Sequence, residues 1–510
     1  MKSGLVRGFL SVGIWTFISR VSGFVRDILM AAWLGTGPVA EAFLIALSLP
    51  NMFRRFFAEG AFNTAFVPLF AKKLEDRPEA QRFASEAFSG LFMVVLVLSA
   101  IAMIFMPGLV WLMASGFQGD ERFDLAVEYG RITFPYILLI SLASMISGVL
   151  NANGRFTAAA AAPVLLNLLF IVAMYLGRWQ GWDLGLTLAW ATPVTGIAQL
   201  GLVWWDAQRT GWTFRPRRPR LSPDMRRLLA IALPAAFAGG VVQINLLIGR
   251  QVGSRFEGAI GWLSYSDRLY QLPLGVVGAA VAVVLLPELA RRLRADDHAG
   301  GQSAYSRATE FGLFLTLPAA FAILVIAQPM VATLFQRGAF TAHDTVQTAN
   351  ALIVYALGLP AFVLQKILQP LYFAREDTRT PLRFALISMV VNAMLAFGLM
   401  SVIGFIAAAW GTTIAAWIMV LQLWLGTRTM GQAARADARL RRAAPRIILS
   451  SALMAAALWL MRDWLDASGI HRAPGLAILV FGGAAIYFTL SFATGAYRLA
   501  ELKAAVRRSR

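Results

Sequence analysis

Long uncharged, apolar stretches limit the fold of this chain more than any other feature of its sequence. A helix crosses the hydrocarbon core of a bilayer with roughly 20 consecutive apolar residues. Only 14% of the residues are charged, against about 25% in ordinary soluble domains. The sequence therefore predicts an all-α, polytopic membrane protein and argues against a soluble enzyme. Seven stretches reach or exceed the spanning length: Ser89–Gly119, Ile132–Gly154, Phe156–Gly177, Leu184–Trp205, Leu228–Gly249, Phe311–Gln336 and Ala473–Tyr497.

The number of spans follows from the remaining apolar segments. The uncharged stretch Phe384–Thr427 is 44 residues long, which is too long for one crossing at a helical rise of 1.5 Å per residue. It is expected to form two helices with a tight turn near 398–404. Less apolar elements are expected at about 9–34, 39–71, 258–290, 344–373 and 440–462. Together these segments predict fourteen transmembrane helices, and the even count places both termini on one side of the membrane.

The distribution of Lys and Arg predicts which side that is. Of the 46 basic residues, 32 lie in the tails and loops on the side of the N-terminus, and eight lie in the opposite loops. Basic residues in short loops stay on the cytoplasmic side, so both termini are expected in the cytoplasm. The formal net charge of +19 is then mainly a topological signal. It calls for no nucleic-acid partner, and the basic linker Arg215–Arg220 is suited to anionic membrane lipids.

An internal repeat of about 220 residues divides the chain. Two six-helix lobes are predicted at 1–210 and 221–430, followed by two C-terminal helices at 440–500. An even number of spans makes the lobes parallel repeats, a plan that secondary transporters use with the substrate site between their halves. Four matched pairs of landmarks recur at offsets between 219 and 225: Pro68 and Pro287, Pro107 and Pro329, Pro135 and Pro360, Trp190 and Trp410.

Charged residues inside the predicted spans are the main functional candidates, because a charge at the centre of a span costs about 2.5–3.5 kcal/mol on insertion scales. The basic ones outnumber the acidic ones, so the membrane interior of the protein is expected to be cationic. Arginine offers a planar fork of donors that suits phosphate and carboxylate. The basic set is Arg20, Arg26, Arg54, Arg55, Arg268 and Lys366, and the acidic set is Asp27, Glu59 and Asp267, with Glu41 nearer a helix end.

Helical spacing separates these candidates. Arg55 and Glu59 are four positions apart and are expected to pair on one helix face. Lys366 either faces the cavity or extends its ammonium group toward the membrane surface. Two interpretations remain for the four arginines that stay after this sorting. In one, these arginines form structural ion pairs with neighbouring helices; in the other, they form an anion-binding site. The excess of positive charge favours the anion-binding site. The four residues are Arg20, Arg26, Arg54 and Arg268.

Other kinds of site find little support in the sequence. The chain has no cysteine, and its three histidines lie in predicted loops. No phosphate-binding loop, catalytic triad or cluster of metal ligands is apparent, so no cofactor, metal or covalent chemistry is predicted. Polar residues within the spans either line a cavity or hydrogen-bond neighbouring helices: Asn167, Gln243, Asn245 and Asn392.

Four segments resemble the MurJ/MviN family of lipid II flippases, which belongs to a larger superfamily of multidrug and oligosaccharidyl-lipid exporters. The resemblance extends over most of the chain and is weakest in the last two helices. Where the family pattern has aspartate, this chain has Glu41, and it has Ser48 where some members have lysine. The matching segments are Ser19–Asp27 (SRVSGFVRD), Leu49–Pro68 (LPNMFRRFFAEGAFNTAFVP), Ile132–Ser144 (ITFPYILLISLAS) and Ser266–Gly278 (SDRLYQLPLGVVG).

The resemblance implies a non-enzymatic transporter in the bacterial cytoplasmic (inner) membrane. Its implied substrate is lipid II, the undecaprenyl-pyrophosphate-linked peptidoglycan precursor, moved from the inner to the outer leaflet. The family's functional arginines fall here on Arg20, Arg26, Arg54 and Arg268. Asp27 and Glu59 match further positions of the family motifs, and Glu41, Arg55 and Asp267 are supporting positions because they are charged residues within or near the predicted spans. The implied partners are lipid II, membrane lipids and the cell-wall synthesis machinery.

Three rival functions remain open at this stage. Export of another polyprenyl-linked oligosaccharide uses the same chemistry, and residue types alone do not separate two pyrophosphate lipids. A cation-coupled multidrug exporter is expected to have an acidic and aromatic cavity instead. A scaffold for cell-wall enzymes leaves the intramembrane arginines unexplained.

Overall fold

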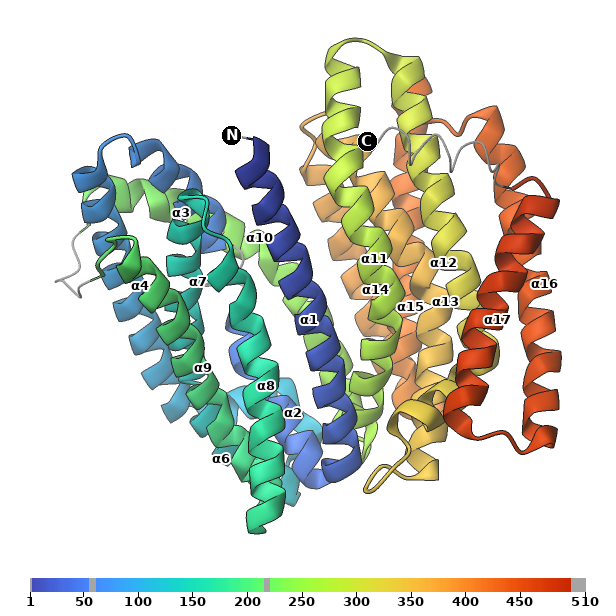
Figure 1. The fold of residues 1–510 in the computed structure, drawn as a ribbon, viewed down its shortest axis with the longest axis horizontal. Helices are drawn as coiled ribbons and strands as arrows, with labels where there is room; N and C mark the ends of the chain where they lie inside the picture. The colour runs from blue at the N-terminus through green and yellow to red at the C-terminus, as the bar shows by residue number, and fades with distance from the viewer. Residues whose placement is uncertain (1, 55–60, 215–220, 497–510) are drawn as a thin grey trace. The chain divides into compact units, whose positions relative to one another are not determined.

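The computed structural model describes residues 2–54, 61–214 and 221–496. These residues form helices, turns and loops, with no β-strand among them. They confirm the predicted all-α class (Figure 1). Contacts along the chain divide it into two compact units. Unit 1 contains Met1–Gly261 and Arg337–Phe340, and unit 2 contains Trp262–Gln336 and Thr341–Arg510.

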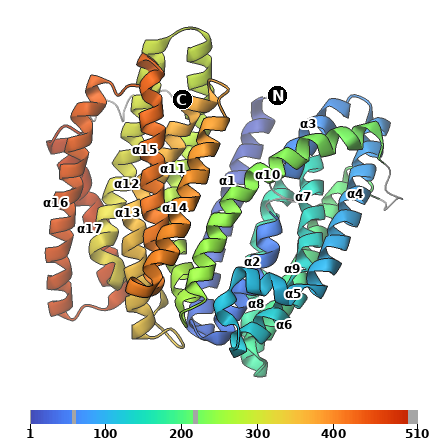
Figure 2. The same ribbon diagram turned by 180° about the vertical axis from the view of Figure 1, so that it is seen from behind.

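Unit 1 is built from ten helices and one short 3-10 turn within the described residues. They are α1 (Lys2–Leu34), α2 (Pro38–Arg54), α3 (Ala61–Lys73), α4 (Arg77–Ile104), α5 (Met106–Met113), η2 (Ser115–Phe117), α6 (Glu121–Thr133), α7 (Tyr136–Ala152), α8 (Thr157–Gln180), α9 (Leu184–Arg209) and α10 (Pro223–Gly253). Figure 2 shows α10 running obliquely across this unit. Near its start Ser222 donates to Glu86 on α4 (2.8 Å), and near its end Gln251 donates to the carbonyl of Trp111 on α5 (3.0 Å).

Unit 2 contains the remaining helices. They are α11 (Ala259–Arg294, whose first turn belongs to unit 1), α12 (His298–Phe335), α13 (Ala342–Phe373), α14 (Arg379–Ile403), η3 (Gly404–Ile406), α15 (Ala407–Gly426), η4 (Thr427–Thr429), η5 (Gln432–Ala434), α16 (Ala438–Ser468) and α17 (Arg472–Ala493). The C-terminal pair, α16 and α17, packs against α12. There Tyr487 donates to the carbonyl of Phe314 (2.7 Å).

Nine segments of the described residues are long and apolar enough to cross a membrane. The predicted pair of helices at 384–427 is confirmed, since α14 ends at Ile403 and α15 begins at Ala407. Gly404 makes the turn with a φ of +66°, which glycine adopts without steric cost. The total of fourteen spans remains a prediction, as do the two-lobe repeat and its boundaries at 210, 221 and 430. The two compact units are defined by packing contacts, so they do not test whether the two halves of the chain repeat one another.

Side-chain caps explain where several helices begin. A carboxylate or hydroxyl before the first turn accepts a hydrogen bond from a backbone N–H that has no partner within the helix. Asp183 caps α9 and Ser222 caps α10. Asp437 caps α16. Thr341 and Asp344 form a reciprocal capping box at the start of α13.

A close approach of two backbones in unit 1 requires glycine at position 338. The N–H of Ala339 donates to the carbonyl oxygen of Ala32 (2.8 Å). Gly338 has a φ of +59°, and a Cβ atom there would lie 2.1 Å from the Ala32 oxygen. The segment Arg337–Phe340 is thus held against the end of α1 by a contact that no side chain at 338 would permit.

Replacing Gly338 with alanine is therefore expected to lower the free energy of unfolding by more than the roughly 1–2 kcal/mol that a left-handed backbone costs an L-residue. Gly154→Ala is the matched control, because Gly154 also has a positive φ (+75°) but no atom lies within 4 Å of the point that a Cβ would occupy there. Thermal unfolding in detergent measures both. Equal losses for the two variants would contradict the importance of the Ala32 contact.

Candidate functional site

The structure places the predicted site residues on three helices. Arg20, Arg26 and Asp27 lie on α1. Glu41 lies in the first turn of α2, and Arg54 is its last residue. Asp267 and Arg268 are on the part of α11 that belongs to unit 2. Arg55 and Glu59 fall outside the described residues, so the pairing expected from their spacing stays a prediction.

Arg26 is buried and is held by contacts on two helices. Its Nε and Nη2 atoms donate to Oδ1 of Asp27 (3.1 and 2.7 Å). Its Nη1 donates to Oδ1 of Asn167 on α8 (3.0 Å), and the guanidinium lies 5.8 Å from the centroid of the Phe170 ring. Charge-assisted hydrogen bonds of this kind compensate for removing an arginine from water. In this conformation Arg26 is a partnered cation that ties α1 to α8.

Asn167 joins the same two helices through its other end. Its Nδ2 donates to the carbonyl of Ser19 (2.9 Å) and to Oγ of Ser22 (3.3 Å). A Cβ at Gly23 would lie 3.2 Å from this Nδ2 atom, so the small residue lets α1 and α8 approach. Of the two roles that the sequence left open for Asn167, the structure shows hydrogen bonding between helices.

Replacing Asn167 with alanine is expected to destabilise the chain by about 1–2 kcal/mol, because Arg26 loses an acceptor and two helices lose a shared link. The control is Asn151→Ala, which changes an exposed asparagine at the end of α7. Comparing their thermal unfolding with that of the unchanged chain measures the difference. An Asn167→Ala variant as stable as the control would show that this link contributes little.

Arg20 and Arg54 differ from Arg26 in their surroundings. Arg20 is exposed on α1, and within the described residues its side chain has no hydrogen bond or ion pair. It lies six positions before Arg26, about 9 Å along the helix axis. Arg54 is half-buried at the end of α2. Of the candidate arginines, α1 thus carries the partnered Arg26 and the exposed Arg20, and α2 carries the half-buried Arg54.

Glu41 is the best-enclosed charged group among these positions. It is fully buried, and its Oε2 accepts from Nη1 of Arg122 on α6 (2.9 Å). Its Oε1 accepts from the backbone N–H of Ile260 (2.9 Å). Asp120 also accepts from Arg122 Nε (2.6 Å), and the Arg122 guanidinium stacks over Phe117 at 4.5 Å. Glu41 therefore connects α2, α6 and the first turn of α11 within unit 1.

Sequence reasoning did not identify Arg122 as part of this network, because Arg122 lies in a segment that hydropathy assigns to a loop. The only signal is the neighbouring Asp120, which caps α6. Although burial opposes its charged form, hydrogen bonds from the backbone N–H and the side chain of Arg122 hold the pKa of Asp120 below its ordinary value. Asp120 thus stays ionised beside Arg122.

On α11, Arg268 is exposed and Asp267 is half-buried. Asp267 accepts a hydrogen bond from Nε2 of Gln271, one turn later. Tyr270 packs against Tyr355 on α13, with ring centroids 4.9 Å apart. The adjacent charges therefore sit beside an aromatic contact between α11 and α13. Lys366, which the sequence also predicts to lie within a span, is exposed on α13.

The described parts of the chain contain no group of three His, Asp or Glu side chains that could hold a metal ion. At the predicted positions the charged groups suited to binding a ligand are arginine guanidinium groups, which bind anions. Arg20 and Arg268 are accessible, and Arg54 is partly so. The carboxylates of Asp27 and Glu41 already hold arginines.

Comparison with known proteins agrees with the resemblance seen in the motifs. Residues 30–472 match the family model described as lipid II flippase MurJ. A protein of Rhizobium meliloti named "Probable lipid II flippase MurJ" is 46% identical, over 99% of this chain and 96% of that protein. The "Lipid II flippase MurJ" of Burkholderia cenocepacia is 36% identical, over 84% of both chains.

Solved structures give the same result. The structure called "Lipid II flippase MurJ, inward closed conformation" superposes with a TM-score of 0.80 at 26% identity, covering 94% of this chain and 97% of that one. An inward-facing multidrug transporter of the MATE family superposes with a TM-score of 0.62 at 16% identity, covering 84% of this chain and 95% of its own. That second likeness shows the fold alone. With a family model matching most of its length and relatives of this similarity, the chain belongs to the lipid II flippase MurJ family of membrane transporters.

Proposed function

We propose that this protein moves lipid II from the inner to the outer leaflet of the bacterial cytoplasmic membrane. The match of residues 30–472 to the lipid II flippase family carries this proposal. It is supported by the names of relatives that are similar over nearly the whole chain. The predicted topology, with both termini in the cytoplasm, is part of the proposal. The cell-wall synthesis machinery is a proposed partner.

The proposed binding site for the pyrophosphate and sugar head consists of Arg20, Arg26, Arg54 and Arg268. Guanidinium groups bind phosphate oxygens through paired, charge-assisted hydrogen bonds. The exposure of Arg20 and Arg268 supports their role as direct ligands. Arg26 is held by Asp27 and Asn167 in this conformation, so its contact with a phosphate requires an exchange of partners.

The proposed transport cycle is alternating access, in which the head passes through the protein while the polyprenyl tail stays in lipid. The head is anionic and the cell interior is negative. Moving one negative charge outward therefore gains about 2.3 kcal/mol per 100 mV of membrane potential. This gain provides a driving force without ATP, and it shrinks to the extent that the arginines move through the field together with the head.

Export of cationic drugs is disfavoured by the same residues. A cavity for cations needs accessible carboxylates, but Asp27 and Glu41 are both buried against arginines, and the half-buried Asp267 is followed directly by the exposed Arg268. The MATE transporter, which shares the fold, therefore gives no support for drug export here. The chemistry at these positions fits an anion.

A reconstituted leaflet-exchange assay tests the proposed function. Proteoliposomes receive labelled lipid II, and the fraction of head groups accessible to an impermeant reagent is followed over time. We expect faster exchange than in protein-free liposomes, and further acceleration when a potential favours movement of the anion. Exchange no faster than in protein-free liposomes would refute the proposal. Faster exchange of another polyprenyl-pyrophosphate glycan would reassign the substrate.

A further inference from the structure

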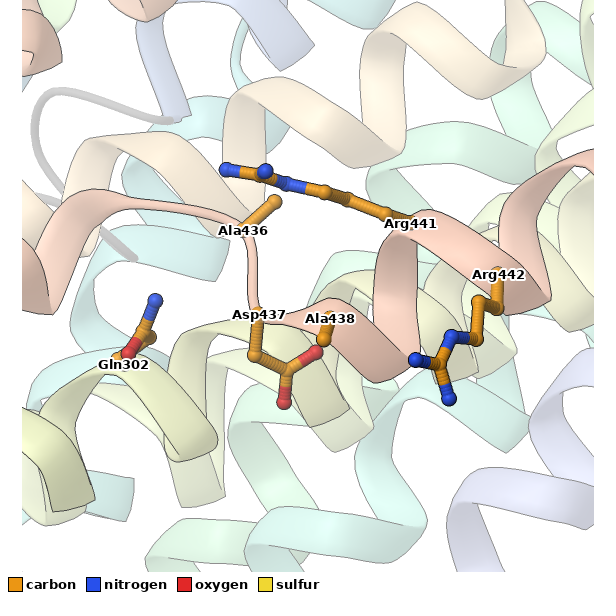
Figure 3. Close-up of a pocket in the computed structure, with 6 residues that line it drawn as sticks. All are labelled: Gln302, Ala436, Asp437, Ala438, Arg441 and Arg442. Carbon is orange, nitrogen blue, oxygen red and sulfur yellow. The ribbon is translucent and has the colours of Figure 1, made fainter.

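A pocket of about 420 Å³ lies where α16 begins, in unit 2 (Figure 3). Gln302 on α12 forms one wall, and the first turns of α16 with the residues before them form the other. In Figure 3 the side chain of Arg441 extends back toward Ala436, while Arg442 projects from the next position of the helix. None of these residues belongs to the proposed lipid II site. The lining residues are Gln302, Ala436, Asp437, Ala438, Arg441 and Arg442.

The one carboxylate of the pocket is already neutralised. Asp437 Oδ1 accepts from the backbone N–H of Leu440 (2.7 Å), and Oδ2 pairs with Arg307 of α12 (2.5 Å). Arg307 also pairs with Glu310, which is 2% exposed and accepts from Arg439 (2.9 Å). This network fixes the beginning of α16 on α12 and satisfies the acid of the pocket.

The pocket therefore presents net positive charge. Arg441 and Arg442 are exposed, and neither side chain has a hydrogen bond or ion pair to the rest of the described chain. Gln302 accepts from Gln432 through its Oε1 (3.3 Å), which leaves its Nε2 amide as a donor at the pocket. Two guanidinium groups and an amide donor suit a phosphate.

An apolar surface continues from these arginines along α16. Ile448 and Leu449 follow Arg441 and Arg442 by seven positions, so each lies on the same helix face two turns further on. They are 48% and 52% exposed. The segment Gln432–Ser468 is long and apolar enough to cross a membrane. A charged pocket at its start, followed by exposed aliphatic side chains, matches the polar head and acyl chains of a lipid.

We propose that this pocket binds the headgroup of an anionic phospholipid, with its acyl chains along Ile448 and Leu449. The predicted cytoplasmic position of this end of α16 is where anionic lipids interact with basic residues. The site is separate from the proposed flippase site, and its occupancy is measurable without any transport. Failure of this proposal can therefore be distinguished from failure of the proposed flippase function.

Native mass spectrometry of the full chain in detergent, titrated with phosphatidylglycerol, tests this site. The Arg441→Gln/Arg442→Gln variant is expected to lose roughly tenfold in affinity for the first bound lipid. Arg226→Gln/Arg227→Gln is the matched control, because this exposed pair occupies the same fourth and fifth positions of α10. The control variant is expected to bind phosphatidylglycerol like the unchanged chain. Phosphatidylcholine is expected to bind no more tightly to the unchanged chain than to the pocket variant.

Three outcomes would overturn the proposal. Equal losses in both double variants would mean that diffuse charge, not the pocket, attracts the lipid. Unchanged binding in the Arg441→Gln/Arg442→Gln variant would place the lipid elsewhere. Displacement of phosphatidylglycerol by inorganic phosphate at similar concentration would identify a site for soluble phosphate compounds. Thermal unfolding of each variant checks that the network around Glu310 is intact.

Discussion

Replacing Arg268 with alanine is expected to slow lipid II exchange roughly tenfold to a hundredfold while leaving membrane insertion unchanged. The side chain is exposed on α11, and its proposed role is to donate charge-assisted hydrogen bonds to the pyrophosphate. Loss of such bonds costs about 1.5–3 kcal/mol. The reconstituted leaflet-exchange assay measures the rate, and the yield of protein extracted from membranes measures insertion.

Two further variants separate binding from general effects of charge. Arg268→Lys keeps the charge but loses the planar fork, so it is expected to recover only part of the rate. Arg294→Ala removes an exposed arginine from the end of the same helix and is expected to exchange lipid II at the unchanged rate. If the Arg268→Ala variant exchanges lipid II as fast as the Arg294→Ala variant, Arg268 is not part of the binding site.

Replacing Arg122 with alanine is expected to produce the largest loss of stability, about 3–5 kcal/mol. Glu41 is fully buried, and without Arg122 its carboxylate keeps hydrogen bonds from backbone N–H groups such as that of Ile260 but loses its cationic partner. Breaking a buried pair by removing one partner leaves an uncompensated charge. Thermal unfolding in detergent measures the loss, which is expected to be much smaller for Arg131→Ala, an exposed arginine on the same helix.

A double variant distinguishes the stranded charge from lost packing. Replacing both members of a buried pair with uncharged residues of similar size is often neutral. Glu41→Gln/Arg122→Met is therefore expected to recover much of the stability that Arg122→Ala loses. If the double variant is no more stable than Arg122→Ala, packing around the guanidinium, including its contact with Phe117, accounts for the effect.

The fold was predictable because membrane helices obey a local rule. Every backbone polar group in lipid must be paired within the helix or barrel, so uncharged length alone indicates a span. This rule identified both helices of the 384–427 stretch, where Gly404 makes the turn. It is less informative for α2 and α3, which are only 17 and 13 residues long, and for α5 and η2, which interrupt the segment after α4. The total number of spans remains a prediction for that reason.

The candidate site was only partly predictable because pairing depends on contacts between distant segments. Adjacent residues such as Arg26 and Asp27 point in different directions in an ideal helix, yet a long side chain reaches back to its neighbour. The partner of Glu41 is 81 positions away, and hydropathy assigns that partner, Arg122, to a loop. Residue type and depth therefore identified the charged positions, but spacing along one helix did not identify their partners.

The binding of lipid II to purified chains tests most directly the central claim that arginines hold the pyrophosphate. Arg20, Arg54 and Arg268 are each replaced with alanine, and lipid II is titrated beside a polyprenyl glycan without phosphate. Each variant is expected to bind lipid II roughly tenfold or more weakly, with unchanged affinity for the neutral lipid. Unchanged affinity for lipid II in all three variants would contradict the claim.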